Sequence, residues 1–157
     1  LTSLPEVSSL SALMDKLLNM CTCFDTYKPI LRKLSPDLTH SQIDEILDYA
    51  LVSGIDGIVA GNTTRSRDGL TIPEEKIKEI GNGGMSGAPV HQKNLEMVRY
   101  IYGKTGSKLP IIGVGGIMTP EQAKEMLDAG ASLIEIYTGF IYEGPAFVEK
   151  ILKYIDK

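Results

Sequence analysis

Two glycine-rich stretches decide the fold of this 157-residue chain: Ile111-Ile112-Gly113-Val114-Gly115-Gly116-Ile117 and, one expected strand later, Tyr137-Thr138-Gly139-Phe140. The first stretch begins as a continuous apolar run, which is typical of a strand buried in a parallel sheet. Both stretches end a strand pattern and lead into a helix pattern. Glycines at such positions free backbone N–H groups to surround an anion. We therefore expect a phosphate site at the carboxyl ends of two consecutive strands.

The rest of the chain alternates between helix and strand patterns around these stretches. Strands are expected over residues 29–34, 55–62, 109–114 and 132–137. Helical spacing of apolar residues covers 8–23, 39–53, 94–104, 119–129 and 147–155, and an irregular stretch fills 63–89. A helix followed by four strand–helix units predicts a parallel sheet with right-handed crossovers.

The glycine-rich loops distinguish an open doubly wound sheet from a segment of a barrel. A dinucleotide-binding sheet would carry G-x-G-x-x-G and an acid about 20 residues later, whereas the glycines at 113–116 are followed by Ile117 and Met118. Phosphate groups are commonly bound after the seventh and eighth strands of a β/α barrel. We therefore expect an α/β fold, a parallel (β/α) barrel represented here by its C-terminal four βα units. This half barrel would form a single domain over residues 1–157.

Composition argues against several classes of function. The net charge is −4 and the basic residues form no stripe, so no nucleic-acid partner is expected. No apolar run approaches the roughly 20 residues that span a bilayer, and a cytoplasmic chain is expected. Cys21 and Cys23 are too few for a structural zinc site, so no metal is expected. His40 and His91 have no acidic cluster beside them and are expected to be loop or surface residues.

Polar residues in and after two further strands are candidates for ligand binding. Asn62 and Thr63 end a strand, where an amide and a hydroxyl can bind a carboxylate or an amide-bearing ring, although a plain turn fits the same pattern. Lys33 either points into a barrel mouth toward an anionic or carbonyl partner or lies in solvent on an edge strand. Residues 83–87 either close over a ligand or form a flexible part of the long loop.

Five ordered motifs resemble those of the dihydroorotate dehydrogenase family, most closely its quinone-dependent class. They are KLSPD at 33–37, GIVAGNTT at 57–64, GGMSG at 83–87, IIGVGGI at 111–117 and YTGF at 137–140. The resemblance covers essentially the whole chain and implies FMN in the mouth of an eight-stranded barrel. It implies oxidation of dihydroorotate to orotate in de novo pyrimidine synthesis, with a proton leaving to a base and a hydride passing to the flavin N5. It also implies a quinone acceptor and a parent enzyme peripheral to the inner face of the membrane.

The resemblance further implies roles for individual residues. Lys33 would face the pyrimidine edge of the flavin and stabilise negative charge on its reduced form, while Asn62 and Thr63 would hold the substrate. The flavin, chiefly its phosphate, would be bound by backbone N–H groups of Gly87, Gly116, Tyr137 and Thr138. The full cofactor-binding set is Lys33, Gly61, Gly87, Gly115, Gly116, Tyr137, Thr138 and Gly139. No catalytic residue is expected in this chain, because the base, a serine in this class, is expected upstream of Leu1.

Three departures from the family pattern lead to further expectations. Only four strands of the barrel are present, Gly61 stands where a threonine that touches the flavin is common, and Arg32 replaces an apolar residue on the helix-facing side of a strand. They suggest a truncated piece or a truncated gene copy under relaxed constraint, inactive by itself. Two unpaired sheet edges predict self-association, or pairing with a missing N-terminal half.

Two other interpretations fit the sequence. A sugar-phosphate isomerase or synthase would keep both phosphate loops but needs an acid and a base at strand ends. The candidate acids are poorly placed for that role, because Asp37 follows a proline turn and Glu135 is expected in mid-strand. A non-catalytic half-barrel remnant would bind phosphate or nothing, and Arg32, Gly61 and the absent half favour it.

Overall fold

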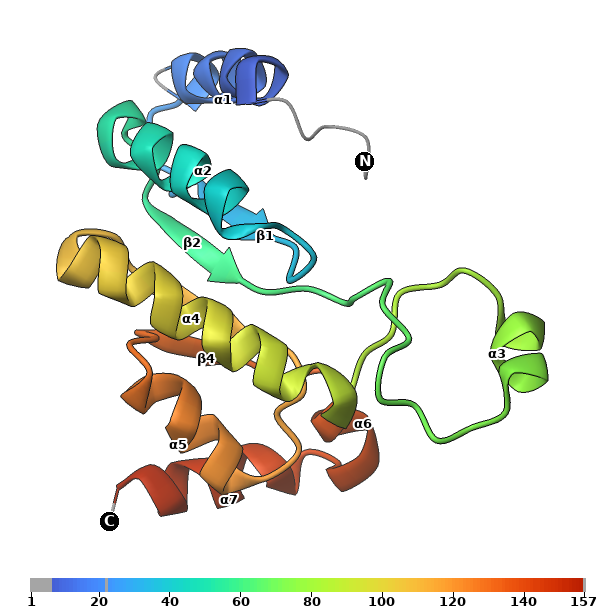
Figure 1. Cartoon of the computed structure of the whole chain (residues 1–157). Helices are drawn as coiled ribbons and strands as arrows, with labels where there is room; N and C mark the ends of the chain where they lie inside the picture. Colours follow the sequence, from blue (N-terminus) through green and yellow to red (C-terminus); the bar gives the residue numbers. More distant parts are fainter. Residues whose placement is uncertain (1–6, 22, 157) are drawn as a thin grey trace.

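A four-stranded parallel sheet forms the centre of the computed structural model, which describes residues 7–21 and 23–156 (Figure 1). Its strands are β1 (Leu31–Leu34), β2 (Gly57–Ala60), β3 (Ile111–Val114) and β4 (Leu133–Glu135). Each strand pairs in parallel with the next one along the chain, in the order β1-β2-β3-β4. A doubly wound sheet would reverse its strand order at a switch point. The observed order is that of a barrel segment, which confirms the expected half barrel.

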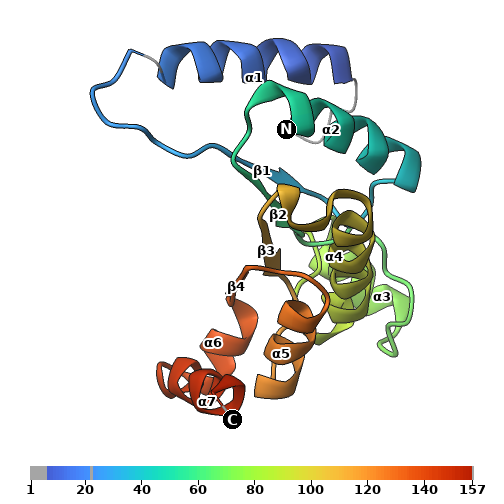
Figure 2. The ribbon, with the colours of Figure 1, turned by 90° about the vertical axis from the view of Figure 1, so that its left-hand side faces the viewer.

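Three of the principal helices connect consecutive strands as crossovers, and a fourth follows the last strand. They are α2 (His40–Ser53), α4 (His91–Thr105), α5 (Pro120–Asp128) and α7 (Ala146–Ile155), and α1 (Val7–Cys21) precedes the first strand. In Figure 2, α2, α4 and α5 lie along the same side of the sheet, and α7 lies beyond α5. This one-sided helix layer is the arrangement of a β/α barrel wall.

The core lies between the sheet and this helix layer. Leu34, Ile58 and Ile111 are at most 1% exposed and pack with buried residues of α2, α4 and α5 in one continuous cluster. Side chains alternate between the two faces of a strand, so the residues next to these in sequence point to the other face. Lys33 pairs in register with Val59, which places both on the face away from the helices.

Arg32 lies on the helix-facing side of β1, as the sequence predicts. Its register partner is Ile58, which is fully buried in the core. The Nε atom of Arg32 is buried and has no hydrogen-bond partner among the described residues. Burial lowers the pKa of the Arg32 guanidinium. A buried donor without an acceptor destabilises the folded state, so the departure at Arg32 carries a physical cost.

The observed elements differ from the expected ones at several boundaries. The expected helix over 8–23 ends at Cys21, and residue 22 lies outside the described part of the chain. Thr39 caps α2 in a reciprocal pair with Gln42, in which each side chain accepts a hydrogen bond from the backbone N–H of the other residue. The helix expected from residue 94 begins at His91. Two short helices, α3 (Glu74–Ile80) and α6 (Thr138–Glu143), were not expected as separate elements.

The expectation that His91 is a loop or surface residue is wrong. His91 is 6% exposed in the first turn of α4, and its Nε2 lies 3.0 Å from Oε2 of Glu125 on α5. No local pattern predicts this partner, because the acid lies 34 residues away along the chain. His40, in contrast, is exposed as expected and stacks on Tyr100 with ring centroids 4.0 Å apart.

A long excursion separates β2 from α4. Thr64 and Met85 close its base with two backbone hydrogen bonds of 3.1 and 2.8 Å, and Figure 1 shows α3 at its far end. α3 is seven residues long and has no buried residue, so it lacks the extended apolar face by which a helix is recognised in a sequence. The closed base brings residues 83–87 back beside the end of β2.

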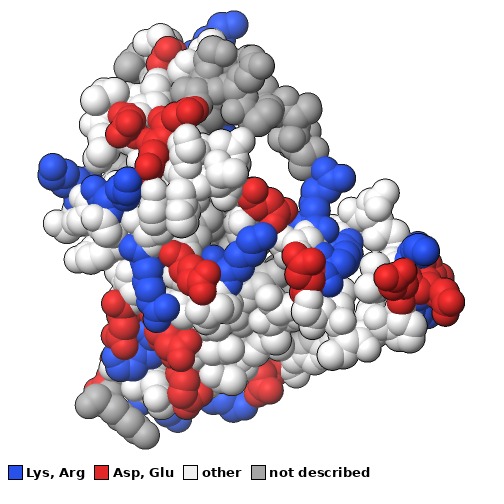
Figure 3. Space-filling view, in the orientation of Figure 1, with Lys and Arg blue, Asp and Glu red and all other residues white. Residues whose placement is uncertain are grey.

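Two further properties concern the whole described chain. Figure 3 shows acidic and basic side chains interspersed over the face in view. None of the helices within residues 7–21 and 23–156 combines the length and the apolar character needed to cross a membrane.

Candidate functional site

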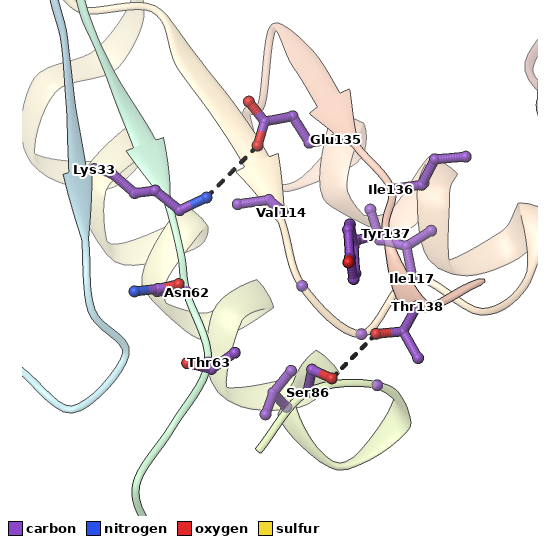
Figure 4. Close-up of a pocket in the computed structure, with 14 residues that line it drawn as sticks. Lys33, Asn62, Thr63, Ser86, Val114, Ile117, Glu135, Ile136, Tyr137 and Thr138 are labelled. Carbon is purple, nitrogen blue, oxygen red and sulfur yellow. Dashed lines mark hydrogen bonds and ion pairs between the residues drawn. The ribbon is translucent and has the colours of Figure 1, made fainter. Parts of the chain in front are cut away.

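A pocket of about 340 Å³ lies where the loops after the strands converge (Figure 4). It is lined by Lys33, Asn62, Thr63, Ser86, Gly87, Val90, Val114, Gly115, Gly116, Ile117, Glu135, Ile136, Tyr137 and Thr138. These residues come from all four strands or the segments after them, and from the end of the long excursion. The carboxyl ends of barrel strands are where ligands bind in this architecture, so the pocket lies at the position that the fold favours for function.

Most residues singled out from the sequence meet in this pocket. The lining includes Lys33, Asn62, Thr63, Gly87, Gly115, Gly116, Tyr137 and Thr138. Gly61 and Gly139 do not line it. Gly139 is buried, and a Cβ there would lie 2.2 Å from the carbonyl oxygen of Ile117, so this glycine lets α6 pack against the loop after β3. The binding of a cofactor and a substrate by these lining residues stays a prediction.

One end of the pocket gathers donors suited to an anion. The hydroxyls of Ser86 and Thr138 lie 3.2 Å apart and join the excursion to the start of α6. Gly116 has a φ of +74°, and a Cβ there would lie 2.4 Å from the backbone nitrogen of His91. A glycine is therefore required where the loop after β3 crosses the start of α4. Successive glycines with hydroxyls nearby form the kind of concavity that binds phosphate.

The other end of the pocket is charged and polar. Lys33 Nζ lies 3.7 Å from Oε2 of Glu135, and Asn62 and Thr63 lie on the same side of the pocket as Lys33 (Figure 4). The expectation that Glu135 lies in mid-strand is wrong, because β4 ends at this residue. The strand pattern continued through Ile136 and Tyr137, but the last two positions belong to the turn into α6.

Asn94 supports the pocket from beneath and was not singled out from the sequence. It is fully buried, and its Nδ2 donates a hydrogen bond of 3.3 Å to the backbone carbonyl of Asn62. A Cβ at Gly61 would lie 2.0 Å from Asn94 Oδ1, and one at Gly115 would lie 2.2 Å from Asn94 Nδ2. Asn94 therefore occupies the space beside two neighbouring strand ends. The available signal was a polar residue within the apolar stripe of α4.

This packing gives a physical reason for Gly61. A side chain at position 61 would meet both Asn94 Oδ1 and, at 2.5 Å, the terminal methyl group of Met97. Asn94 and Met97 of α4 fill the space that a threonine side chain at position 61 would occupy, so a glycine fits there. The departure at Gly61 fits its surroundings and does not by itself indicate relaxed constraint.

Asp37 holds the loops behind the pocket together. Its carboxylate accepts hydrogen bonds from the Thr64 hydroxyl, from the backbone N–H of Arg65 at 2.8 Å and from Lys93 Nζ at 2.8 Å. Partial burial acts to raise the pKa of Asp37, but the hydrogen bonds from Lys93, Thr64 and Arg65 outweigh it and hold the pKa below its ordinary value. Asp37 does not line the pocket, and its contacts suit an anchor for the residues after Asn62 and Thr63.

Fold and pocket together define half of a β/α barrel with a ligand site at its strand ends. The Dihydroorotate dehydrogenase family model matches residues 2–157, and the chain belongs to the dihydroorotate dehydrogenase family. The relatives include a protein named Dihydroorotate dehydrogenase (quinone) from Rhodococcus opacus (strain B4), 44% identical over 98% of this chain and 42% of the relative. Another of that name, from Nostoc punctiforme, is 45% identical over 98% of this chain and 41% of the relative.

Solved structures agree with this assignment. DHODH from Eimeria tenella in complex with ferulenol superposes with a TM-score of 0.86 and 28% sequence identity, over 98% of this chain and 44% of that one. The ligand-free type of the same protein gives a TM-score of 0.85. The chain therefore spans about two fifths of the length of these relatives.

Replacing Gly61 tests its match to Asn94. We expect Gly61→Thr to lower the free energy of unfolding by about 1–3 kcal/mol, because the added side chain overpacks the space beside Asn94. In an Asn94→Ser background the same substitution is expected to cost less than about 1 kcal/mol. Urea unfolding of the four proteins of this double-mutant cycle measures the coupling. Gly103→Thr, at an exposed helix position with nothing within 4 Å of the added Cβ, is the control. Equal losses in both backgrounds would contradict the match.

Replacing Asp37 tests its role as an anchor. We expect Asp37→Asn to lower the free energy of unfolding at pH 7 by about 1–3 kcal/mol, because the replaced carboxylate accepts charge-assisted hydrogen bonds. A carboxylate with a lowered pKa contributes its stability above its ordinary pKa of 3.8 and loses it as the pH falls through the folded value. The difference in free energy of unfolding between the variant and the wild type should therefore become smaller below about pH 4.

Asp128→Asn is the matched control for this measurement. It removes a carboxylate from the exposed pair with Lys124, and such pairs contribute at most about 1 kcal/mol. A gap for Asp37→Asn that is no larger than that of the control, or that does not change with pH, would show that Asp37 does not hold the loops.

Proposed function

We propose that this chain forms the FMN-binding C-terminal half of a dihydroorotate dehydrogenase barrel, a single domain that would contribute to oxidation of dihydroorotate to orotate in pyrimidine synthesis. The observation that carries the proposal is the pocket at the strand ends, where residues from five separate motifs meet. The family assignment and the extent of its match along the chain support the same conclusion.

The residues of the pocket fit FMN in both size and polarity. A volume of about 340 Å³ lies within the usual range of roughly 300–1,000 Å³ for small-molecule sites. FMN carries a phosphate at one end and a polar ring at the other. Gly87, Gly116 and Thr138 offer backbone donors and a hydroxyl at one end of the pocket, and Lys33 offers a cation at the other.

The chain's own residues would act by binding and orientation. Backbone N–H groups of Gly87, Gly116, Tyr137 and Thr138 would hold the phosphate, with the Thr138 hydroxyl beside them. Lys33 would place positive charge next to the pyrimidine edge of the ring. Asn62 and Thr63 would bind the substrate through an amide and a hydroxyl, which can pair with both donors and acceptors of a pyrimidine. FMN, when bound, supplies the acceptor for the hydride that leaves the substrate.

The remaining parts of the reaction belong to a longer protein of this family. We assign removal of the substrate proton to a serine in the part of the barrel that this chain does not span. The isolated chain would then bind ligands without turnover. The quinone acceptor and a peripheral position at the inner face of the membrane are likewise proposed for the parent enzyme, and the first rests on the names of the relatives.

The unpaired edges of the sheet favour self-association. β1 and β4 are the edges of the described sheet, and each has hydrogen-bonding groups on one side that no described strand pairs. Either a second copy of the chain or the N-terminal half of a parent enzyme would cover these edges. A sugar-phosphate isomerase or synthase loses its support, because the family assignment accounts for both glycine-rich loops.

Titration with FMN tests the proposed function. We expect saturable quenching of flavin fluorescence by the 157-residue chain, and binding of riboflavin at least about tenfold weaker, because loss of a charge-assisted hydrogen bond costs roughly 1.5–3 kcal/mol. Ser86→Ala and Thr138→Val, which remove single hydroxyls at the phosphate end, should weaken FMN binding several-fold and leave riboflavin binding unchanged.

Gly103→Ala is the control, since it lies on α4 outside the pocket and should bind FMN like the wild type. Far-ultraviolet circular dichroism checks that each variant is folded. Absence of saturable binding by the folded wild-type chain, or equal affinities for FMN and riboflavin, would contradict the proposal and favour the non-catalytic remnant.

A further inference from the structure

The pocket contains two charged side chains, and they carry opposite charges. Lys33 and Glu135 are the only charged residues among those that line it. Their charged atoms lie 3.7 Å apart, and Figure 4 shows the pair reaching toward each other above Val114. A carboxylate in a pocket proposed for an anionic cofactor is unfavourable by itself, so its presence needs a reason.

The pair spans the inner face of the sheet from one edge strand to the other. Lys33 is on β1 and Glu135 ends β4, with two strands between them. In a flat sheet these strands would be about 14 Å apart, at roughly 4.8 Å per step. The ammonium and the carboxylate meet because the sheet curves as a barrel wall does and because both side chains are long. The register places them on one face. Lys33 pairs with Val59 and Val59 pairs with Ile112, while Val114, two residues after Ile112, pairs with Glu135.

The pair contributes little to the stability of the fold. The side chains of Lys33 and Glu135 are 48% and 47% exposed, and ion pairs this open to solvent are weak. Ladder hydrogen bonds and the core on the opposite face hold β1 and β4 in place. A weak, solvent-exposed pair in a pocket can rearrange when a ligand arrives, which a buried pair cannot do at low cost.

We propose that Glu135 positions Lys33 and sets how strongly the pocket favours reduced over oxidised FMN. This inference rests on the proposed function. A hydride brings two electrons and one proton to the ring, so the ring gains one negative charge. Lys33 stabilises that charge, and Glu135 weakens this stabilisation because it shares the ammonium. The two side chains therefore act as opposing controls on the affinity for the reduced cofactor.

Glu135 would then be a positioning residue, a role that no local pattern in the sequence predicts. Glu135 does not act as an acid or a base toward the substrate. It acts through Lys33, by holding the ammonium at the end of the pocket where Asn62 lies (Figure 4). With glutamine in place of Glu135, Lys33 would lose this ion pair and would interact with the reduced ring alone.

The test compares the affinities of the folded chain for oxidised FMN and for dithionite-reduced FMN under anaerobic conditions. We expect Glu135→Gln, which keeps the size of the side chain and removes its charge, to shift the ratio of the two affinities about tenfold toward reduced FMN. For a two-electron couple, a tenfold shift raises the midpoint potential of the bound flavin by about 30 mV. Lys33→Gln should shift the ratio in the opposite direction.

Two further variants make the result specific. Glu121→Gln removes an exposed carboxylate in the first turn of α5, outside the pocket, and should leave the ratio unchanged. In a Lys33→Gln background, Glu135→Gln should shift the ratio much less than it does alone, because Glu135 acts through Lys33. Glu135→Ala serves as a second neutral variant should Glu135→Gln fail to fold.

The outcomes separate this inference from the function on which it rests. If both proteins bind FMN and the ratio of affinities for reduced and oxidised FMN in Glu135→Gln is within twofold of the wild-type ratio, the inference alone is overturned. An equal shift with and without Lys33 would overturn the positioning role. Failure of the wild-type chain to bind either form of FMN would overturn the proposed function and the inference together.

Discussion

Hydrogen bonding between four parallel strands, each paired with the next along the chain, is the constraint on which the site depends. This order brings the carboxyl ends of β1 to β4 to one edge of the sheet. Residues separated by about 100 positions, such as Lys33 and Glu135, then line the same pocket. Side-chain alternation along the strands decides which face of the sheet each residue occupies. It sends Leu34 and Ile58 into the core and leaves Lys33 on the free face.

The loops are held in place by packing behind the pocket rather than inside it. Asn94 fills the space beside Gly61 and Gly115, and the start of α4 fills the space beside Gly116. Asp37 joins the turn after β1 to the residues after β2 and to α4. The glycines thus serve two purposes: they present backbone donors to a ligand, and they allow α4 to approach the sheet closely. A larger residue at these positions would clash with the side chains and backbone packed behind the pocket, even with no ligand bound.

Patterns local in the sequence predicted the fold and much of the site. Apolar runs, caps such as Thr39 and the two glycine-rich loops identify the strands, the main helices and the loops that converge, because each of these signals lies within one continuous stretch of the sequence. Partners distant in the sequence could not be predicted in the same way. The contact of His91 with Glu125, the pair of Lys33 with Glu135 and the packing of Asn94 against Gly61 all depend on register between separate elements. The helix α3 was missed for another reason: it is seven residues long and buries no residue, so it has no extended apolar face.

Amide NMR spectra recorded during titration with FMN would show whether the loops that contain Gly87, Gly116 and Thr138 form one anion site. We expect the amide resonances of these three residues to shift together and to saturate at one FMN concentration, while those of Gly54 and Gly103, which lie outside the pocket, do not move. Absent shifts, or shifts of the three amides that saturate at different concentrations, would contradict a single site formed by these strand ends.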